Sequence, residues 1–195
     1  MKITGGKYRG KSIESRPERT VRPTTSFVRE AIFNILKHGK FLYDDQFIAD
    51  DNPDQVADRR VVDIFCGTGA LGIEALSRGA THVTFVDQNS QTLSLTRQNV
   101  AHIGELDRAA FLRSDSTMLP RAPKPCHLAF IDPPYHQELV SKALKSLKQQ
   151  GWLEPGAIVV IEQGKRDDST VPEGFILLSD RVHDKTRITL LQYQG

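Results

Sequence analysis

From residue 60 onward, segments with the pattern of buried strands alternate with segments of helical periodicity. The strand-like runs are VVDIF, HVTFVD, AAFLRSD, HLAFID and AIVVIEQ, and stretches such as ALGIEALSRG and LVSKALKSLKQQG lie between them. Two last runs, GFILLSDRV and RITLLQYQ, are spaced to pair as a closing hairpin. This alternation predicts an α/β fold whose mostly parallel sheet is covered by helices on both faces.

The ends of the predicted strands are where a ligand is expected. In open α/β sheets the site lies at the carboxyl ends of the strands, near the point where the strand order reverses. Acidic residues stand at four such ends: Asp63 before CGTG, Asp87, Asp115, and Asp132 before PPY. The search for chemistry therefore begins with these four positions.

The loop after the first of these strands is rich in glycine. Gly67, Gly69 and Gly72 form a G-x-G-x-x-G pattern, and Asp87 lies 20 residues beyond Gly67. Taken literally, this is the dinucleotide fingerprint of a nicotinamide dehydrogenase, with an acid for the ribose hydroxyl groups. The glycines and Asp87 alone indicate a nucleoside, without requiring a diphosphate.

Asp63 favours a different cofactor. A carboxylate four residues before Gly67 would repel a nearby diphosphate, but it suits the sulfonium and ammonium groups of S-adenosylmethionine. Asp115 is placed to accept a hydrogen bond from the adenine amine, although an isolated aspartate at a strand end is equally often a turn former. The D-x-x-x-G-x-G order thus points to a methyl donor.

The fourth strand ends in the sequence LAFIDPPY, residues 128–135. Prolines cannot continue a ladder of backbone hydrogen bonds, so the strand must stop and present Asp132 and Tyr135 at its tip. An exocyclic amine of a base attacks a methyl group only if its nitrogen becomes more tetrahedral. Asp132 and a carbonyl of the stiff Pro133-Pro134 segment can accept its two hydrogens, and Tyr135 offers a face for base stacking. The alternative reading is a rigid turn followed by a core aromatic.

Charge is distributed unevenly along the 195 residues. Residues 1–40 hold ten Lys or Arg against three Glu, whereas residues 41–195 hold 16 basic and 21 acidic side chains. The first 40 residues are therefore predicted to form a basic extension, a hairpin plus a helix, that binds a polyanion. Residues 41–58 read as an acidic linker or loop, and residues 59–195 as the main domain. A solvated lysine-rich terminus is the competing interpretation of the charge.

Other features of the composition narrow the class of protein. Two cysteines, Cys66 and Cys126, are too few for a disulfide scaffold and lack metal-ligand spacing, so no metal is expected. The N-terminal residues MKITGGKYRGK have no apolar segment typical of a signal peptide, and no apolar run is long enough to span a membrane. These observations predict a cytoplasmic protein without a membrane partner.

DPPY after a D-x-x-x-G-x-G loop resembles the class I S-adenosylmethionine-dependent methyltransferases that act on exocyclic amines of bases. Four segments in order, ITGGKYRGK, TVRPTTSFVREAIFNIL, VVDIFCGTGALGIEALSRGA and LAFIDPPY, are similar to the RsmD family, the 16S ribosomal RNA guanine-N2 methyltransferases of bacteria. The resemblance implies a Rossmann-like domain with a seven-stranded sheet. It also implies a 16S ribosomal RNA substrate, either as RNA or within an assembled small subunit.

The resemblance assigns roles to individual residues. It implies cofactor contacts by residues of the strand ends and the glycine loop, namely Asp63, Cys66, Gly67, Gly69, Asp87 and Asp115. It implies a catalytic tip formed by Asp132, Pro133, Pro134 and Tyr135. Our candidates for contact with RNA phosphates are Arg9, Lys11, Arg22 and Arg29. A DNA adenine-N6 methyltransferase, an RNA-binding module without turnover and a nicotinamide dehydrogenase remain as alternatives.

Overall fold

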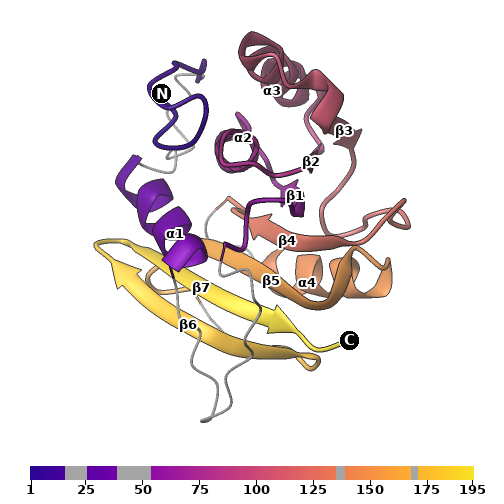
Figure 1. Cartoon of the computed structure of the whole chain (residues 1–195). Helices are drawn as coiled ribbons and strands as arrows, with labels where there is room; N and C mark the ends of the chain where they lie inside the picture. The colour runs from indigo at the N-terminus through magenta and orange to yellow at the C-terminus, as the bar shows by residue number, and fades with distance from the viewer. Residues whose placement is uncertain (16–25, 39–53, 135–138, 168–170) are drawn as a thin grey trace.

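The computed structural model describes residues 1–15, 26–38, 54–134, 139–167 and 171–195. Within these residues, seven strands form one sheet in the order β3-β2-β1-β4-β5-β7-β6 (Figure 1). The strands are β1 (Arg60–Ile64), β2 (His82–Asp87), β3 (Ala109–Arg113), β4 (Cys126–Ile131), β5 (Leu153–Gly164), β6 (Phe175–His183) and β7 (Thr186–Tyr193). The helices are α1 (Ser26–His38), α2 (Ala70–Ser77), α3 (Ser90–Ile103), α4 (Leu139–Gln149) and the 3-10 turn η1 (Leu106–Arg108).

The sheet is mixed. Strands β3, β2, β1, β4 and β5 run parallel to one another, while β7 is antiparallel to both β5 and β6. The predicted α/β class, the mostly parallel seven-stranded sheet and the closing hairpin are confirmed. The chain crosses from β3 at one edge back to β4 beside β1, so the strand order reverses between β1 and β4. That reversal is where a ligand site is expected.

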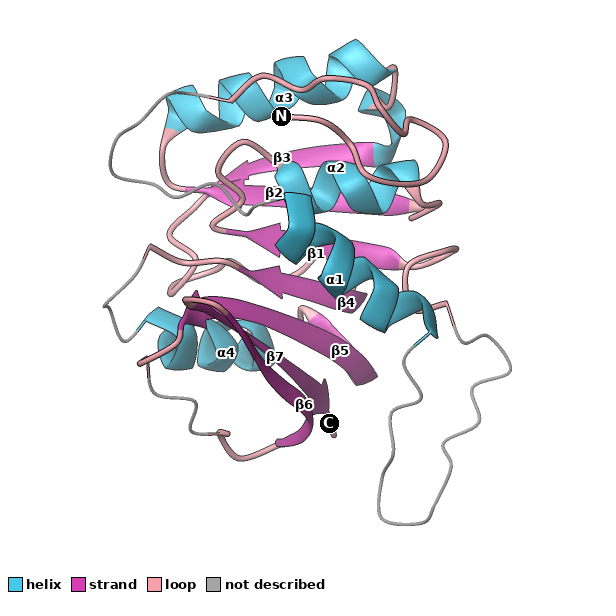
Figure 2. Ribbon diagram, turned by 90° about the vertical axis from the view of Figure 1, so that its left-hand side faces the viewer, coloured by secondary structure: helices cyan, strands magenta, loops and turns pink. Residues whose placement is uncertain are grey.

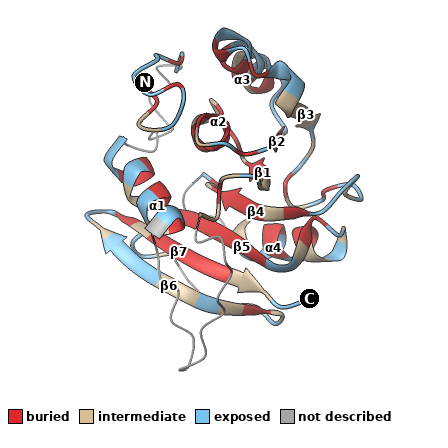
Figure 3. Ribbon diagram, viewed as in Figure 1, coloured by how far each residue is buried: buried red, intermediate tan, exposed pale blue. Residues whose placement is uncertain are grey.

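Helices cover both faces of the sheet, as the alternation predicts (Figure 2). On one face, buried residues of α1, α2 and α3 pack against alternate strand residues such as Val61, Phe130 and Val160. On the other face, α4 packs against the intervening residues, such as Val62 and Ile131. The central strands are therefore buried on both sides, whereas the edge strand β6 is largely exposed (Figure 3).

Local sequence explains where the helices lie. In α1, Val28, Ile32 and Leu36 recur at helical spacing and are buried, and the Phe33 ring lies 5.6 Å from that of Phe130 on β4. Helix α3 begins after Asn89, whose side chain accepts hydrogen bonds from two backbone N–H groups of the first turn. It ends at a glycine in the left-handed conformation, at position 104.

Residues 1–15 form a short, irregular hairpin. An antiparallel bridge joins Lys2 and Ser12, and backbone hydrogen bonds join Met1 to Ile13 and Ile3 to Lys11. The hairpin is also bonded to the main domain: the backbone N–H and hydroxyl of Thr4 both donate to the Glu74 carboxylate on α2, at 2.9 and 2.8 Å. Ile3, Tyr8 and Ile13 join the same hydrophobic core as α1–α3. This packing on α2 and α3 holds the short hairpin against the main domain.

The predicted acidic segment, residues 41–58, lies largely outside the described residues. Its last part is described: Asp54 accepts backbone hydrogen bonds from Val56 and Ala57, and Val56 is buried in the core of the α1–α3 face. The chain is thus tied to the main domain several residues before β1 begins.

Candidate active site

The carboxyl ends of three neighbouring parallel strands meet at one edge of the sheet. Ile64 of β1 is paired with Val86 of β2 on one side and with Ile131 of β4 on the other. The residues that follow, including Asp87 and Asp132, therefore flank the beginning of the glycine loop. The loop and the residues 132–134 that follow β4 are far apart in sequence, but they are adjacent in space because β1 and β4 are adjacent.

The loop after β1 has an unusual backbone. Phe65, Gly67 and Gly69 all have positive φ values, of 58°, 54° and 79°. At Gly67 an added Cβ would meet only the Phe65 carbonyl, at 3.9 Å, whereas at Gly69 it would strike the Thr96 Cγ2 at 2.5 Å. The loop is therefore closed on its inner side by α3 and open at Gly67, where the backbone can approach a ligand closely.

Polar side chains from α3 and from the segment after β3 hold this loop, and sequence reasoning missed them. Thr96 donates its hydroxyl to the Gly67 carbonyl at 2.7 Å, and Asn99 donates to the Thr68 carbonyl at 3.1 Å. Ser116 accepts a hydrogen bond from the Phe65 N–H at 3.3 Å. The sequence did contain a signal for Thr96, because the helical spacing places it on the same face as Leu93 and Val100. In the structure Thr96 is fully buried.

Asp63 lies behind the loop. Its side chain is 1% exposed and accepts a hydrogen bond from the Gly72 N–H of α2 at 2.9 Å. Burial raises the pKa of Asp63 well above its ordinary value; the Gly72 N–H opposes the shift, and the charges of Asp132 and Asp87 add to it. The Asp63 carboxyl group thus links β1 to α2, and the charged residues at the ends of both neighbouring strands affect its pKa.

Asp87 and Cys66 lie at the entrance of the loop. The two carboxylate oxygens of Asp87 accept hydrogen bonds from the Gly67 N–H at 3.2 Å and the Asn89 N–H at 2.8 Å. Burial raises the pKa of Asp87, and the two N–H groups oppose that shift. Asp87 is only half-buried, and each oxygen retains a lone pair for a hydroxyl group. Burial also raises the pKa of the Cys66 thiol, which keeps it neutral.

Asp115 behaves as a turn former in this structure. It follows β3, is exposed, and accepts hydrogen bonds from the backbone N–H and the hydroxyl of Thr117, at 2.8 and 2.7 Å. These two bonds lower the pKa of Asp115. Both hydrogen bonds are accepted by the same oxygen, Oδ1.

The tip of β4 is described as far as Pro134. Asp132 is half-buried, Pro133 is buried and Pro134 is exposed, so the strand ends where the sequence predicts. Tyr135 lies outside the described residues, and its predicted stacking role is a proposal. Asp63 and Asp132 lie at the ends of the adjacent strands β1 and β4, and the charge of Asp132 adds to the raised pKa of Asp63.

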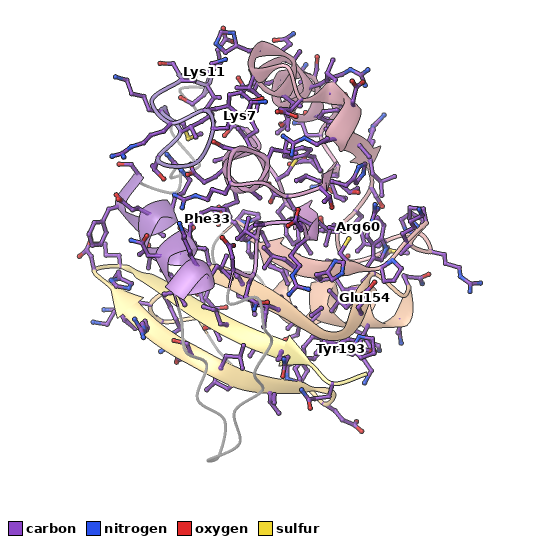
Figure 4. All side chains as sticks on the ribbon, in the orientation of Figure 1. Lys7, Lys11, Phe33, Arg60, Glu154 and Tyr193 are labelled. Atoms are coloured by element: carbon purple, nitrogen blue, oxygen red, sulfur yellow. The ribbon has the colours of Figure 1, made fainter. Side chains whose placement is uncertain are left out.

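The N-terminal loop presents exposed basic side chains. Arg9 and Lys11, both predicted to contact RNA, are exposed, and so is Lys7. The ammonium groups of Lys7 and Lys11 each lie 5.0 Å from the centre of the Tyr8 ring (Figure 4). Tyr8 is buried and donates its hydroxyl to the Glu105 carboxylate, which is also paired with Arg108 at 2.6 Å. The two ammonium groups thus lie near an aromatic ring whose position is fixed by the hydrogen bond to Glu105.

Arg29 differs from its predicted role. Its side chain is 2% exposed and donates hydrogen bonds to the Lys2 carbonyl at 2.8 Å and to the Met1 sulfur at 3.2 Å. The prediction of a surface phosphate contact is wrong for this residue, because α1 turns it inward beneath the N-terminal segment. Arg22, the other candidate near α1, lies outside the described residues.

In the part of the chain that the structure describes, no helix is long and apolar enough to cross a membrane. The His, Cys, Asp and Glu side chains of the same part do not gather in groups of three or more with the spacing of a metal site.

A protein-family model described as "Conserved hypothetical protein 95" matches residues 1–192. The chain belongs to this family. A relative from Escherichia coli strain K12, named Ribosomal RNA small subunit methyltransferase D, is 27% identical over 196 residues, covering 100% of this chain and 91% of the relative. A protein of the same name from Buchnera aphidicola is 27% identical over 190 residues, covering 96% of this chain and 91% of the relative. The predicted membership of the RsmD family is confirmed.

The solved structure of the Escherichia coli protein yhhF has the same fold over the full chain. It superposes with a TM-score of 0.80 at 28% sequence identity, covering 100% of this chain and 98% of that one. The match includes the N-terminal segment as well as the sheet, so the extension is part of the family's architecture.

Proposed function

We propose that this protein transfers a methyl group from S-adenosylmethionine to the exocyclic N2 of a guanine in small-subunit ribosomal RNA. The observation that carries the proposal is the adjacency of the glycine loop and the Asp132 tip on β1 and β4. Membership of the RsmD family and the names of the relatives support the substrate class.

The residues of the loop fit the methyl donor. Gly67 leaves open space over its backbone, and the carboxylate of Asp87 keeps acceptor capacity for the two ribose hydroxyl groups. Asp63 is buried behind the loop, where a cationic ligand would favour its ionised form and a diphosphate would oppose it, so the site suits a cation better than a diphosphate. Cys66 and Gly69 shape the loop, and Asp115 remains the candidate for the adenine amine through its second oxygen. When bound, S-adenosylmethionine supplies an electrophilic methyl group on a sulfonium.

The residues of the tip then act on the nucleophile. Asp132 accepts one hydrogen of the guanine amine, and a carbonyl of the Pro133-Pro134 segment accepts the other, which draws the nitrogen lone pair out of conjugation. Tyr135 stacks on the extruded base. As the nitrogen gains the methyl group it becomes acidic, and its proton passes to Asp132 or to water.

The exposed cations of the N-terminal loop hold the RNA backbone. Arg9 and Lys11, with Lys7 beside them, are available for phosphate contacts, and the fixed Tyr8 ring keeps Lys7 and Lys11 together. Arg22 completes this set as predicted from the sequence. The substrate is small-subunit RNA, either alone or in an assembled subunit.

The test is methylation of undermethylated small ribosomal subunits with labelled donor, followed by digestion of the RNA. We expect N2-methylguanine as the labelled product, and more than a hundredfold loss of rate in the Asp132→Ala variant with unchanged donor affinity. Label in N6-methyladenine, or a wild-type protein that binds neither S-adenosylmethionine nor its product, would contradict the proposal.

A further inference from the structure

Asn99 is a buried polar side chain on α3 that bonds to two segments far apart in the sequence. It is 3% exposed and lies where the N-terminal segment passes α3 (Figure 2). Its amide oxygen accepts a hydrogen bond from the Glu14 N–H at 2.8 Å, and its amide nitrogen donates to the Glu14 carbonyl at 3.0 Å. The same nitrogen donates to the Thr68 carbonyl at 3.1 Å. One planar group therefore joins residue 14 to the loop after β1.

The contacts of Asn99 fix how its amide is turned. Two carbonyl oxygens face its nitrogen, which has two hydrogens to donate, and one N–H faces its oxygen. Turning the amide by half a rotation would place its oxygen against the two carbonyls. Each hydrogen thus has its own acceptor, and the positions of the Glu14 backbone and the Thr68 carbonyl depend on each other.

Helix α3 holds two successive carbonyls of the loop after β1. Thr96 donates to the Gly67 carbonyl, and Asn99, three residues later on the same helical face, donates to the next carbonyl. In a trans peptide the N–H points opposite to the C=O, so the Thr68 N–H is turned away from α3. The Gly67 N–H is held by Asp87. The bond from Asn99 therefore helps to set the backbone that faces the donor in the proposed function.

The Glu14 backbone belongs to the segment that carries the exposed cations. It follows Lys11 by three residues, on the second arm of the short hairpin. Ser77 of α2 fastens the loop itself through the Tyr8 N–H, and Asn99 fastens the arm that leaves the loop. RNA phosphates bound by Lys11 would therefore restrict the arm that Asn99 holds.

We propose that Asn99 is a positioning residue that couples the two substrates: RNA bound at the N-terminal loop favours binding of S-adenosylmethionine at the loop after β1, and the donor favours RNA. This inference rests on the proposed function. The physical reason is that ordering one side of the shared amide also orders the other side, so the second ligand loses less conformational entropy when it binds.

The coupling is reciprocal. The factor by which RNA raises the affinity for the donor must equal the factor by which the donor raises the affinity for RNA. The exposed cations contribute to this factor only when RNA is bound. Changing them therefore leaves the affinity of the RNA-free protein for the donor unaltered.

Binding measured with and without the other ligand tests the coupling. The affinity for labelled S-adenosylhomocysteine is measured by equilibrium dialysis, alone and with saturating undermethylated small subunits, in the wild type and in Asn99→Leu. Leucine has a similar volume but no hydrogen-bonding group. We expect the subunits to raise the wild-type affinity at least about fivefold, and the Asn99→Leu affinity less than about twofold. A wild-type ratio of one, or a variant that keeps the wild-type ratio, would overturn the inference.

Two matched controls each loosen one side of the link. The Thr96 hydroxyl bonds to the loop after β1 and to its own helix, whereas the Ser77 hydroxyl bonds to the N-terminal loop. Thr96→Val should weaken S-adenosylhomocysteine binding, and Ser77→Ala subunit binding, by about threefold to tenfold. Each loss should be equal with and without the other ligand, so the ratio stays at its wild-type value. A ratio that falls to one in both controls would refute a specific role for Asn99.

Hydrogen exchange in the wild type gives a second measurement that needs no variant. The Gly69 N–H, which bonds to the Cys66 carbonyl at 2.7 Å, should exchange more slowly when small subunits are bound without any donor. Unchanged exchange at this position would contradict the coupling. Failure of the proposed function is distinct, since the wild type would then transfer no methyl group to small-subunit RNA.

Discussion

The loop after β1 and the N-terminal loop both turn on glycines, but they present opposite surfaces. In the loop after β1, residues 65–69, which we call the donor loop, Gly69 and Gly67 allow a tight backbone. Buried polar groups such as Thr96 hold its inner side. In the N-terminal loop, Gly6 and Gly10 have φ values of 74° and 85°, and the residues between them include exposed cations. In the function proposed above, one loop brings bare backbone to a small ligand, whereas the other brings charge to a polyanion.

The difference lies in what each loop is fastened to. The donor loop is fastened to the sheet and α3 on its inner side, which fixes its geometry. The N-terminal loop is fastened through Tyr8, Ser77 and Glu105, and its long charged side chains remain outside. Precise positioning suits a methyl transfer, and mobile charge suits binding to phosphates without reading sequence.

The largest effect is expected from Gly72→Ala, which attacks the anchoring of the donor loop. An added Cβ would lie 2.3 Å from the Phe85 Cε1 and 2.9 Å from the Asp63 Oδ2, so the interior must move. We expect a loss of about 3 kcal/mol of unfolding free energy, measured by urea denaturation. Gly10→Ala is the control: its Cβ would meet nothing within 4 Å, so only its positive φ opposes alanine, at about 1 kcal/mol. Equal losses in the two variants would show that close packing of the interior does not distinguish the donor loop from the N-terminal loop.

Next in size is Asp87→Asn, which tests the outer face of the donor loop. The substitution removes a charged acceptor for hydroxyl groups, so affinity for S-adenosylhomocysteine should fall about tenfold to a hundredfold, as measured by calorimetry. Asp115→Asn serves as the comparison, because its carboxylate is exposed and occupied by Thr117. Because only its second oxygen is left for the adenine amine, we expect a smaller loss there, of about threefold to tenfold. A larger loss at Asp115 than at Asp87 would reverse the assignment.

Glu105→Gln tests the fastening of the N-terminal loop. The Arg108 hydrogen bond is the largest cause that lowers the pKa of Glu105, from 4.5 to about 2, with Tyr8 also contributing. A lowered folded-state pKa stabilises the protein above pH 4.5, and this stabilisation is lost as the pH falls toward 2. The variant should therefore be less stable at neutral pH, by about 1–2 kcal/mol, and the gap should close in acid. Thermal melts at several pH values measure it, and a constant gap would exclude the ion pair as its origin.

The smallest effect is expected for Arg9→Ala combined with Lys11→Ala, which removes charge from the N-terminal loop alone. RNA affinity should fall about threefold to tenfold, and the slope of log affinity against log salt should decrease by about 2. Lys142→Ala with Lys145→Ala removes two exposed charges from α4, on the other face of the sheet, and should leave RNA affinity unchanged. Donor affinity should be the same in both double variants. A loss of donor affinity in the first would mean that the two loops are not separate.

Much of the fold was predictable because its signals are local. Apolar runs such as VVDIF and the helical spacing of α1 and α4 identified the elements, and the parallel order followed from their alternation. The two arms of residues 1–15 are joined by the Lys2–Ser12 bridge and by backbone hydrogen bonds, but the sequence does not reveal that Thr4 finds its partner on Glu74. The predicted closing hairpin already implied a mixed sheet, because the two strands of a hairpin are antiparallel.

The sequence by itself determined which residues stand at the strand ends: the glycine loop, the acids at the ends of β1, β2 and β4, and the prolines that stop β4. Spacing and side-chain type are enough for this, because strand ends and tight turns are local features. Only the tertiary structure decided which charges face solvent and which face the interior. Arg9 and Arg29 belong to one basic segment, yet one is exposed and the other is buried in the field of Glu74 and Glu162. The burial and the pairing of a charged side chain depend on residues far away in the chain, so they cannot be predicted from the composition of one segment.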